Sequence, residues 1–407
     1  MKNNIFITVA VMLTTEVSAS NIRSEFKADT SGTCYSAITA APVNPFSNGI
    51  AGNWRPKTTY IYYGNRVEQD ATQNINIRTA GNIADFVPFW KQENNNWKAT
   101  DDSIRWVWNQ QSTLINAKGF ELENKDPLGR YNAGIYGYDD ELPVAVIQNS
   151  RYREVVSEGF EDYDYGVRAY LTSCPVGRSF DFTGRKSWLD STVSHTGKFS
   201  LLLPPGENFS IGALVSAEEI TDFNFSINTK GVACRADIVG LDAIRMDKKV
   251  IIPSFTPFPG RKMLLSAWVK EQADCKCDNY AHAEIMVRAG SNTVSCKPSG
   301  NIIDGWQRIE QVIDVPADAT QFSVEFIAVG TGVYFDDLRI HPYSANMKSY
   351  AYDPVTLRLM AELDENNFAS FYEYDDEGTL VRVKKETERG IKTIKESRSA
   401  LIKDGIF

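Results

Sequence analysis

The residues with the clearest potential for chemistry form the motif Cys275-Lys276-Cys277, which is followed by His282 and Cys296. Thiolates and imidazole nitrogens are the usual zinc ligands, so one interpretation is a zinc site. The alternative is a disulfide at a strand end, for example between Cys277 and Cys296 across a hairpin. We favour the disulfide, because the chain begins with an export signal and an oxidising compartment removes free thiolates.

Motifs of known catalytic sites are not found in the sequence. It contains no nucleophile elbow, phosphate-binding loop, dinucleotide-binding glycine motif or His-Glu-x-x-His helix. The histidines His195, His282 and His341 lie in no recognisable triad context. A glycosidase needs only two carboxylates at a set separation, which the 52 acidic residues could include. We therefore expect a protein without enzymatic activity and keep a carbohydrate-active hydrolase as the less favoured alternative.

The composition is that of a globular protein. The chain is 43 % hydrophobic and 12 % aromatic, which is enough to build a sizeable core. Its net charge is −9, and the basic residues are interspersed among the acidic ones. This balance argues against a nucleic-acid partner or a polybasic membrane patch.

The N-terminus is typical of a secretory signal peptide. Lys2 supplies the charged start, residues 5–13 form a short apolar core, and Val17-Ser18-Ala19 provides the small residues before a cleavage site. No later stretch reaches the ~20 apolar residues of a membrane helix. We expect a secreted or extracellular cell-surface protein with no transmembrane segment after cleavage. Its six cysteines, an even number, favour disulfides.

Composition and turn signals divide the chain into five segments. These are a signal peptide (1–19), a polar linker (20–33), an aromatic β-rich domain (34–155), a jelly-roll domain (156–343) and a charged β-hairpin tail (344–407). In the fourth segment, apolar and polar residues alternate as in half-buried strands. The predicted strands there are 199–203, 233–239, 263–270, 283–288, 307–315, 322–329 and 333–340. Such spacing fits a two-sheet sandwich, so the predicted fold class is all-β.

The tail predicts a meander of short strands. Residues 371–383 read as a hairpin whose turn is Asp375-Asp376-Glu377-Gly378. The glycine can adopt the positive φ that such a turn needs. A second turn at Glu388-Arg389-Gly390 precedes one more strand.

Four sequence segments, taken in their order along the chain, resemble the jelly-roll sandwich of non-catalytic carbohydrate-binding modules. They begin at Gly159-Phe160-Glu161-Asp162-Tyr163, Ser194-His195-Thr196-Gly197, Leu264-Leu265-Ser266-Ala267-Trp268 and Gly332-Val333-Tyr334-Phe335-Asp336-Asp337. The resemblance implies binding rather than catalysis. It also implies a structural Ca²⁺ held by Glu161 and by Asp336 or Asp337, because hard carboxylate oxygens suit this ion. Since neighbouring residues of a strand face opposite sides, we expect only one of the two aspartates to reach the ion.

The same resemblance implies a glycan-binding surface. Sugar rings stack their C–H faces on aromatic side chains, while polar groups take the hydroxyls. Trp188, Trp268 and Lys270 are the candidate glycan-binding residues, and core packing is the alternative for Trp268. We expect Trp306 to be a packing anchor and His195 to be a turn residue that packs the edge of the sandwich.

The aromatic residues of the N-terminal domain allow two interpretations. They include Trp54, Trp90, Trp97, Trp106 and Trp108. Trp106 and Trp108 are two positions apart and so share one face of a strand. They line a groove or, as we prefer, form an apolar sheet face that a neighbouring domain covers.

Sequence segments outside the jelly roll resemble the C-terminal portion of bacterial Rhs-like (YD-repeat) cell-surface proteins. In that family, this portion carries an inserted carbohydrate-binding-like sandwich. The tail segment Tyr372-Glu373-Tyr374-Asp375-Asp376 is similar to a YD repeat. Further segments similar to this family are residues 52–56, 119–131, 136–146 and 149–154. The chain has one or two such elements, whereas the family builds large β-shells. The resemblance implies a scaffold, and no toxin segment follows the tail.

Together these features predict a non-catalytic secreted or cell-surface protein whose jelly roll binds a glycan or polysaccharide. The alternative is a structural Rhs-like scaffold or adhesion protein that contacts other cell-surface proteins, with the sandwich as a spacer.

Overall fold

The computed structural model describes residues 8–11, 58–64, 86–94, 96–115, 120–163, 165, 178–218, 225–232, 235–243, 255–273 and 277–397. The predicted linker (20–33), Trp54 and Cys34, Cys174, Cys234 and Cys275 lie outside these residues. In the described ranges the regular structure is β-strand apart from the short 3₁₀ helices η1 (Tyr152–Glu154) and η2 (Thr183–Trp188). The prediction of an all-β fold is confirmed.

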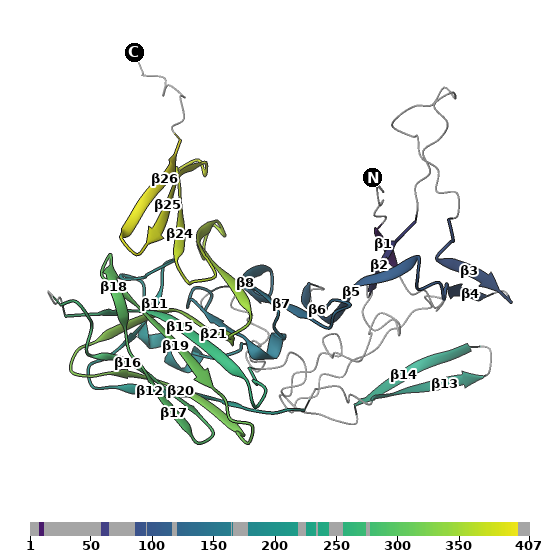
Figure 1. Ribbon diagram of the computed structural model, residues 1–407, viewed down its shortest axis with the longest axis horizontal. Helices are drawn as coiled ribbons and strands as arrows, with labels where there is room; N and C mark the ends of the chain where they lie inside the picture. Colours follow the sequence, from purple (N-terminus) through teal and green to yellow (C-terminus); the bar gives the residue numbers. More distant parts are fainter. Residues whose placement is uncertain are drawn as a thin grey trace, which may run out of the picture.

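Eleven strands in the described part of the chain form one antiparallel meander (Figure 1). In spatial order they are β1 (Thr8–Val11), β2 (Thr58–Tyr62), β5 (Trp106–Ile115), β6 (Glu121–Lys125), β7 (Tyr131–Gly137), β8 (Leu142–Gln148), β22 (Asn346–Tyr352), β23 (Leu359–Leu363), β24 (Ala369–Tyr374), β25 (Leu380–Thr387) and β26 (Gly390–Glu396).

The meander joins segments that the sequence assigns to separate domains. β8 pairs directly with β22, so that Gln148 lies opposite Asn346. Residues 34–155 and 344–407 therefore contribute strands to the same sheet, and the residues between them are an insertion in it. β1 lies within the predicted signal peptide and pairs with β2 at the edge of the sheet.

The insertion is the predicted two-sheet sandwich. Among the described residues, one sheet has seven strands and the other has four. The seven are β9 (Val156–Glu158), β10 (Leu189–Asp190), β11 (Ser200–Leu203), β15 (Lys262–Glu271), β18 (Ser299–Ile303), β19 (Trp306–Asp314) and β21 (Val333–Pro342). The four are β12 (Asn208–Leu214), β16 (Ala283–Ala289), β17 (Asn292–Cys296) and β20 (Gln321–Ala328).

Two strand pairs lie outside both large assemblies. β3 (Trp90–Glu93) pairs with β4 (Asn96–Ala99), and β13 (Phe225–Val232) pairs with β14 (Arg235–Ala243). The predicted strand 233–239 falls largely in β14. Its assignment to the sandwich is therefore wrong, because β14 pairs with β13 in a separate ribbon.

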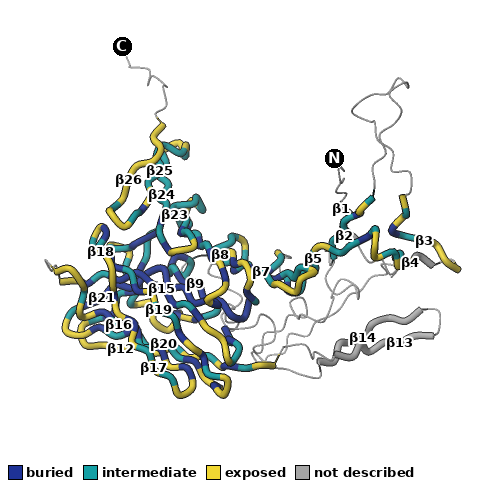
Figure 2. Tube along the Cα trace, in the orientation of Figure 1, coloured by how far each residue is buried: buried dark blue, intermediate teal, exposed yellow. Residues whose placement is uncertain are grey.

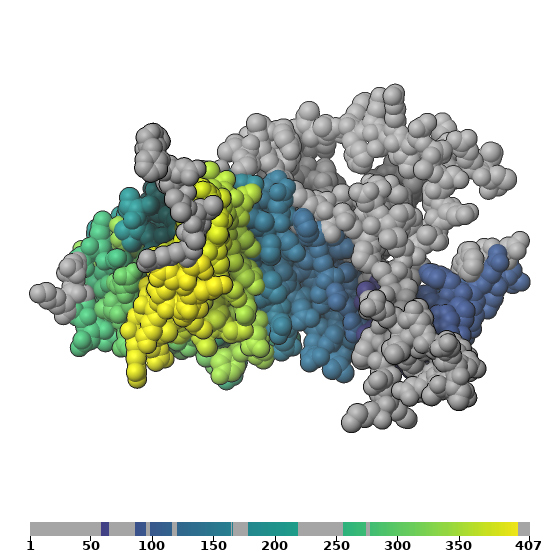
Figure 3. Space-filling view, turned by 90° about the horizontal axis from the view of Figure 1, so that it is seen from above, coloured from purple at the N-terminus to yellow at the C-terminus, as the bar shows by residue number. Residues whose placement is uncertain are grey.

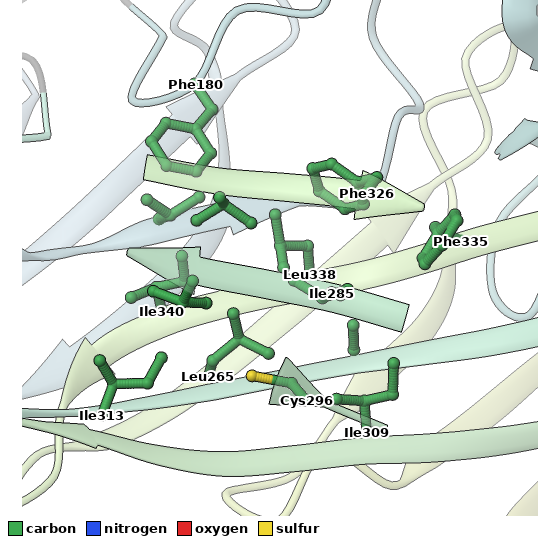
Figure 4. Close-up of a cluster of buried hydrophobic side chains, with 14 of the residues drawn as sticks. Phe180, Leu265, Ile285, Cys296, Ile309, Ile313, Phe326, Phe335, Leu338 and Ile340 are labelled. Carbon is green, nitrogen blue, oxygen red and sulfur yellow. The ribbon is translucent and has the colours of Figure 1, made fainter. Parts of the chain in front are cut away.

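The sandwich core forms where the inner faces of the two sheets meet (Figure 4). Burial alternates along β20, where Phe322, Val324 and Phe326 point inward. The ring of Phe326 lies 5.2 Å from that of Phe335 on the opposite sheet, at an edge-on angle of 82°. Alternation in the sequence thus places one face of each strand in the core, as expected for strands that are half buried.

β21 is buried along its whole length, unlike the other strands of the sandwich (Figure 2). One of its faces contributes Phe335, Leu338 and Ile340 to the sandwich core. Its other side faces the meander, where buried Arg339 donates hydrogen bonds to Ser349 Oγ and to the carbonyls of Leu363 and Asp364. The space-filling view shows the C-terminal strands against the sandwich (Figure 3).

The tail forms the predicted hairpin. β24 and β25 are antiparallel partners, and Gly378 in their turn has φ +86°. Gly390, with φ +109°, begins β26 after the second predicted turn. Both glycines occupy the left-handed region that other residues rarely adopt.

We predict that Phe326→Ala lowers the free energy of unfolding by about 3–5 kcal/mol, because it leaves a cavity in a closely packed core. Urea unfolding followed by circular dichroism measures the change. The matched control is Ser323→Ala on the outer face of the same strand, with an expected change within about 0.5 kcal/mol. Equal effects of the two substitutions would contradict the assigned inner and outer faces.

Candidate functional site

A β-bulge brings Asp336 and Asp337 to the same place. Across β15 and β21, Ser266 pairs with Arg339 and Trp268 with Asp336, so two residues of β21 face one of β15. Asp337 lies in this bulge with φ +48°. The prediction that the two aspartates face opposite sides is wrong, because the bulge interrupts the alternation.

Both aspartates bind the turn at residues 194–197. Asp336 Oδ2 accepts hydrogen bonds from the backbone N–H groups of His195 (2.8 Å) and Thr196 (3.3 Å). Asp337 accepts one from the Thr196 hydroxyl (2.8 Å) and lies 2.7 Å from Nδ1 of His195. Burial, followed by the charges of Asp337 and Glu161, raises the pKa of Asp336 well above its usual range.

His195 connects the sandwich to the meander. Its Nε2 lies 3.1 Å from Glu386 Oε1 on β25, so its ring is held between the carboxylates of Asp337 and Glu386. The ring also stacks on Trp268 with 4.3 Å between centroids. Burial disfavours the charged imidazolium, but hydrogen bonds to both carboxylates outweigh it and raise the pKa of His195 to about 9. The buried turn residue His195 therefore links the sandwich to the meander.

We predict that Glu386→Ala lowers the free energy of unfolding by about 3–5 kcal/mol, because the buried His195 Nε2 and the Ala369 backbone N–H both lose their hydrogen-bond acceptor. Urea unfolding of the full chain measures this. Glu388→Ala, an exposed change in the following turn, is the control and should stay within about 0.5 kcal/mol. If Glu386→Ala changes the free energy of unfolding no more than this control does, the contact between His195 and Glu386 contributes nothing to stability.

Glu161 presents an unpaired oxygen inside the molecule. Its Oε1 accepts hydrogen bonds from the backbone N–H groups of Lys198 (2.8 Å) and Phe199 (2.9 Å), while Oε2 is buried without a partner. A Cβ built on Gly197 would lie 2.1 Å from Glu161 Oε1, so glycine is needed for this close approach. Burial raises the pKa of Glu161 to about 8.

A small polar cavity of about 70 Å³ adjoins this carboxylate. Glu161, Asp162 and Asp337 line it together with Arg178 and Arg339. Its volume suits an ion or a few water molecules and is too small for a sugar ring. The unpaired Oε2 fits a cation that prefers oxygen ligands. Within the described ranges, no three His, Cys, Asp or Glu side chains are arranged to hold one metal ion.

Trp268 is not a surface platform. It is completely buried, its Nε1 donates a hydrogen bond to the Asn367 carbonyl (2.7 Å), and its ring packs edge-on against Phe368. Prediction of a sugar-stacking role for Trp268 is therefore wrong, since the meander covers this face. No local sequence signal shows this, because Asn367 and Phe368, which cover Trp268, lie about a hundred residues later in the chain. Trp306 is buried in the same cluster, in agreement with its predicted packing role.

Trp188 and Lys270 lie in different parts of the sandwich. Trp188 is half buried, packs edge-on against Phe209 of β12 and has the Arg185 guanidinium 4.6 Å from its ring. Lys270 ends beside the β18–β19 turn, with Nζ 3.0 Å from the position of a Cβ on Gly305. The predicted trio of glycan-binding residues is thus not assembled into one surface.

In the described part of the N-terminal segment, a group of aromatic residues packs together, whereas Trp54 and the Trp97 side chain lie outside the described residues. Trp106 is buried, and its Nε1 donates a hydrogen bond to the Val87 carbonyl (2.7 Å). Its ring lies 4.9 Å from that of Tyr62 and 5.3 Å from that of Phe89. Residues 86–90 of the same segment therefore cover this face, whereas we expected a neighbouring domain to cover it.

Of the two described cysteines, Cys277 takes part in a disulfide, but not with the suggested partner. Cys277 is disulfide-bonded, and Cys296 is a free thiol buried in the sandwich core. The suggested Cys277–Cys296 pair is therefore wrong, and a zinc site that uses both is excluded. His282 instead places Nδ1 2.9 Å from Glu271 Oε2.

A larger groove lies where the sandwich meets strands β23–β26 of the meander. Its volume is about 620 Å³, which is in the range of ligand-binding clefts. The apolar residues that line it are Ile303, Trp306, Met360, Phe371, Tyr372 and Ile391. The polar residues are Ser194, His195, Asp304, Glu373, Lys384, Glu386 and Thr393. The sequence gives no signal for this groove, because the residues of its two walls are far apart in the chain.

Charges within the groove are mostly paired. Glu373 contacts Lys384 and accepts a hydrogen bond from Arg382 (2.6 Å). The hydrogen bond from Lys384 lowers the pKa of Glu373. The carboxylic acids with raised pKa values, such as Glu158 and Glu161, lie at the small cavity instead.

The outer face of the four-stranded sheet is polar. Arg288 on β16 forms an ion pair with Glu325 on β20 (2.7 Å between Nη1 and Oε2). Ser295 donates a hydrogen bond to Glu284 (2.5 Å). These side chains bind one another across a sheet face that the meander does not cover.

Comparison with known proteins found partial likenesses to carbohydrate-binding modules. No protein-family model and no curated protein matches the chain. A family 16 carbohydrate-binding module matches at 13 % identity over 37 % of this chain and 82 % of its own, with a TM-score of 0.22. The CBM22-1 xylan-binding domain from Paenibacillus barcinonensis matches at 11 % identity over 38 % and 78 %, with a TM-score of 0.20.

The enzymatically active domain of bacteriophage CBA120 tailspike protein 4 is also similar. It matches at 13 % identity over 38 % of this chain and 17 % of its own, with a TM-score of 0.22. At these TM-scores the likenesses do not define what this chain does. In the described ranges, no helix is long and apolar enough to cross a membrane.

Proposed function

We propose that this is a non-catalytic glycan-binding protein of the cell surface or the secreted fraction, and that its glycan lies in the 620 Å³ groove. The observation that carries the proposal is the composition of the groove walls. Phe371 and Tyr372 are partly exposed there, beside Trp306 and the polar pair Glu373–Lys384. Aromatic faces stack on sugar C–H groups, and charged or amide groups take the hydroxyls.

The groove lies where it does because the meander covers part of the sandwich. The meander packs over Trp268 and the buried length of β21, so this part of the outer face of the seven-stranded sheet is closed to ligands, while Glu310 and Asp314 of β19 stay exposed. Where that face ends, at residues 303–306, the groove begins. The proposed contact surface thus combines residues of the sandwich with residues of the meander.

A binding role without turnover is supported by the ionisation of the groove acids. Glycoside hydrolysis uses one carboxylic acid with a raised pKa and one carboxylate. In the groove, Lys384 keeps Glu373 charged, and Glu386 is engaged by His195 and by the backbone N–H of Ala369 (3.0 Å).

A second candidate function is that of a scaffold. The observation that favours it is the continuous meander, which carries the sandwich as an insertion and covers one of its faces. In this interpretation the chain is an Rhs-like structural or adhesion protein, and its partners are other cell-surface proteins.

We also propose that a structural Ca²⁺ is held beside Glu161. Glu161 and either Asp336 or Asp337 would contribute carboxylate oxygens, and backbone carbonyls would complete the six to eight ligands that this ion takes. The ion would supply positive charge to a cluster of buried acids. The unpaired Oε2 of Glu161 supports this site.

If Ca²⁺ is bound at 100 times its Kd, removing it should cost about 2.7 kcal/mol, or a fall in Tm of about 5–10 °C. Differential scanning calorimetry in Ca²⁺ and in EGTA measures the shift. Glu161→Gln should abolish the shift, whereas the exposed change Glu207→Gln should retain it. An identical Tm of the wild-type protein in both buffers would refute the calcium site.

We predict that Phe371→Ala weakens glycan binding about 2- to 12-fold, because stacking on an aromatic ring contributes about 0.5–1.5 kcal/mol. A glycan array on the full chain finds the ligand, and isothermal titration calorimetry measures the loss.

Lys384→Ala should also weaken binding. Lys385→Ala is its matched control, since Lys385 is the next residue of β25 and points to the opposite face. Binding that both lysine changes leave unaltered would place the glycan elsewhere. A folded protein that binds no glycan on the array would favour the scaffold.

A further inference from the structure

Asp304 stands at the edge of the groove in a constrained turn. Asp304 and Gly305 form the two-residue connection between β18 and β19, in which Ile303 pairs with Trp306. Their φ angles of +50° and +83° are those of a tight hairpin turn, for which Asp-Gly is a favoured sequence. The turn therefore holds the aspartate in a defined place.

The turn is also fixed relative to the meander. Asn301 donates a hydrogen bond to the Glu388 carbonyl (2.8 Å), and Arg308 donates one to the Asn366 carbonyl. These contacts lie on both sides of Asp304 in the sequence and reach two different turns of the meander. The carboxylate is thus presented on a rigid rim, which lowers the entropic cost of binding a ligand.

Among the residues that the structure describes, Asp304 is the charged residue of the groove whose side chain has no partner. Lys384 contacts Glu373, and His195 is held by Asp337 and Glu386. Among the described residues, Asp304 forms no hydrogen bond through its side chain and no ion pair, although Lys270 ends beside Gly305. Of the groove's ionic side chains, it is the one whose oxygens are available to a ligand.

We propose that Asp304 is the specificity-determining acceptor of the groove, and that it selects neutral glycans with adjacent hydroxyls over acidic ones. This inference rests on the proposed function and names its ligand class. A carboxylate has two oxygens and can accept hydrogen bonds from two neighbouring hydroxyls. Hydrogen bonds to a charged acceptor are the stronger kind.

Acidic sugars are disfavoured for two reasons. A uronate or sulfate would lie close to the Asp304 carboxylate, and like charges repel at such distances. The cations that line the groove, Lys384 and His195, are already paired with acids. An acidic glycan would therefore have to break an existing ion pair to gain Lys384 or His195 as a partner.

Binding of the full chain to neutral and acidic probes tests this. The probes are oligosaccharides of glucose, mannose, galactose and xylose on one side, and oligogalacturonate on the other. The wild-type protein should bind at least one neutral probe and not oligogalacturonate. Asp304→Asn should weaken neutral binding about 10- to 100-fold, because a hydrogen bond to a charged group contributes about 1.5–3 kcal/mol.

Two controls separate the possible failures. Asp318→Asn, an exposed change in the loop after β19, should bind like wild type, and all variants should keep the wild-type Tm. Preferential binding of oligogalacturonate by wild type, or equal neutral binding by Asp304→Asn and wild type, overturns the role of Asp304 while glycan binding stands. No binding to any probe overturns both this inference and the proposed function.

Discussion

The structure depends on the burial of charged groups along β21. This strand is inaccessible over its whole length, yet it carries Asp336, Asp337 and Arg339. Charged groups removed from water are tolerated only when other groups bind them. Here the partners come from the 194–197 turn on one side and from the meander on the other. The need to satisfy these charges therefore fixes how the inserted sandwich sits on the sheet that carries it.

The groove follows from this arrangement. Arg339 binds carbonyls of β23 and its following turn, and His195 binds Glu386 of β25. These contacts hold strands β23–β26 against one part of the sandwich and leave a gap beside the β18–β19 turn. A ligand in that gap would touch both assemblies, so the proposed binding surface requires both of them. The same covering closes the part of the seven-stranded sheet around Trp268, where the sequence suggested a sugar platform.

Much of the fold could be predicted from the sequence. The alternation at 263–270, 322–329 and 333–340 locates β15, β20 and β21 to within two residues, because period-2 patterns are local. The tail hairpin follows from its glycine turns. The burial of Trp268 could not be predicted in this way, since it depends on packing against Phe368, a hundred residues later in the chain.

The candidate site was predicted in part. Asp336 and Asp337 bind the 194–197 turn and Glu161 binds the backbone that follows it, while the calcium ion that the resemblance implies stays a prediction. The bulge that turns both aspartates toward it has no signature in a short sequence pattern. Glu386 and Asp304 gave no local signal either, because their roles arise from contacts between segments that are far apart in the chain.

The location of the glycan is tested most directly by hydrogen–deuterium exchange of the full chain with and without a saturating oligosaccharide that the array identifies. The account predicts slower exchange in residues 303–306, 371–373 and 384–386, which form the two walls of the groove. Protection confined to β12, β16, β17 and β20 would contradict it, because the glycan would then lie on the outer face of the four-stranded sheet.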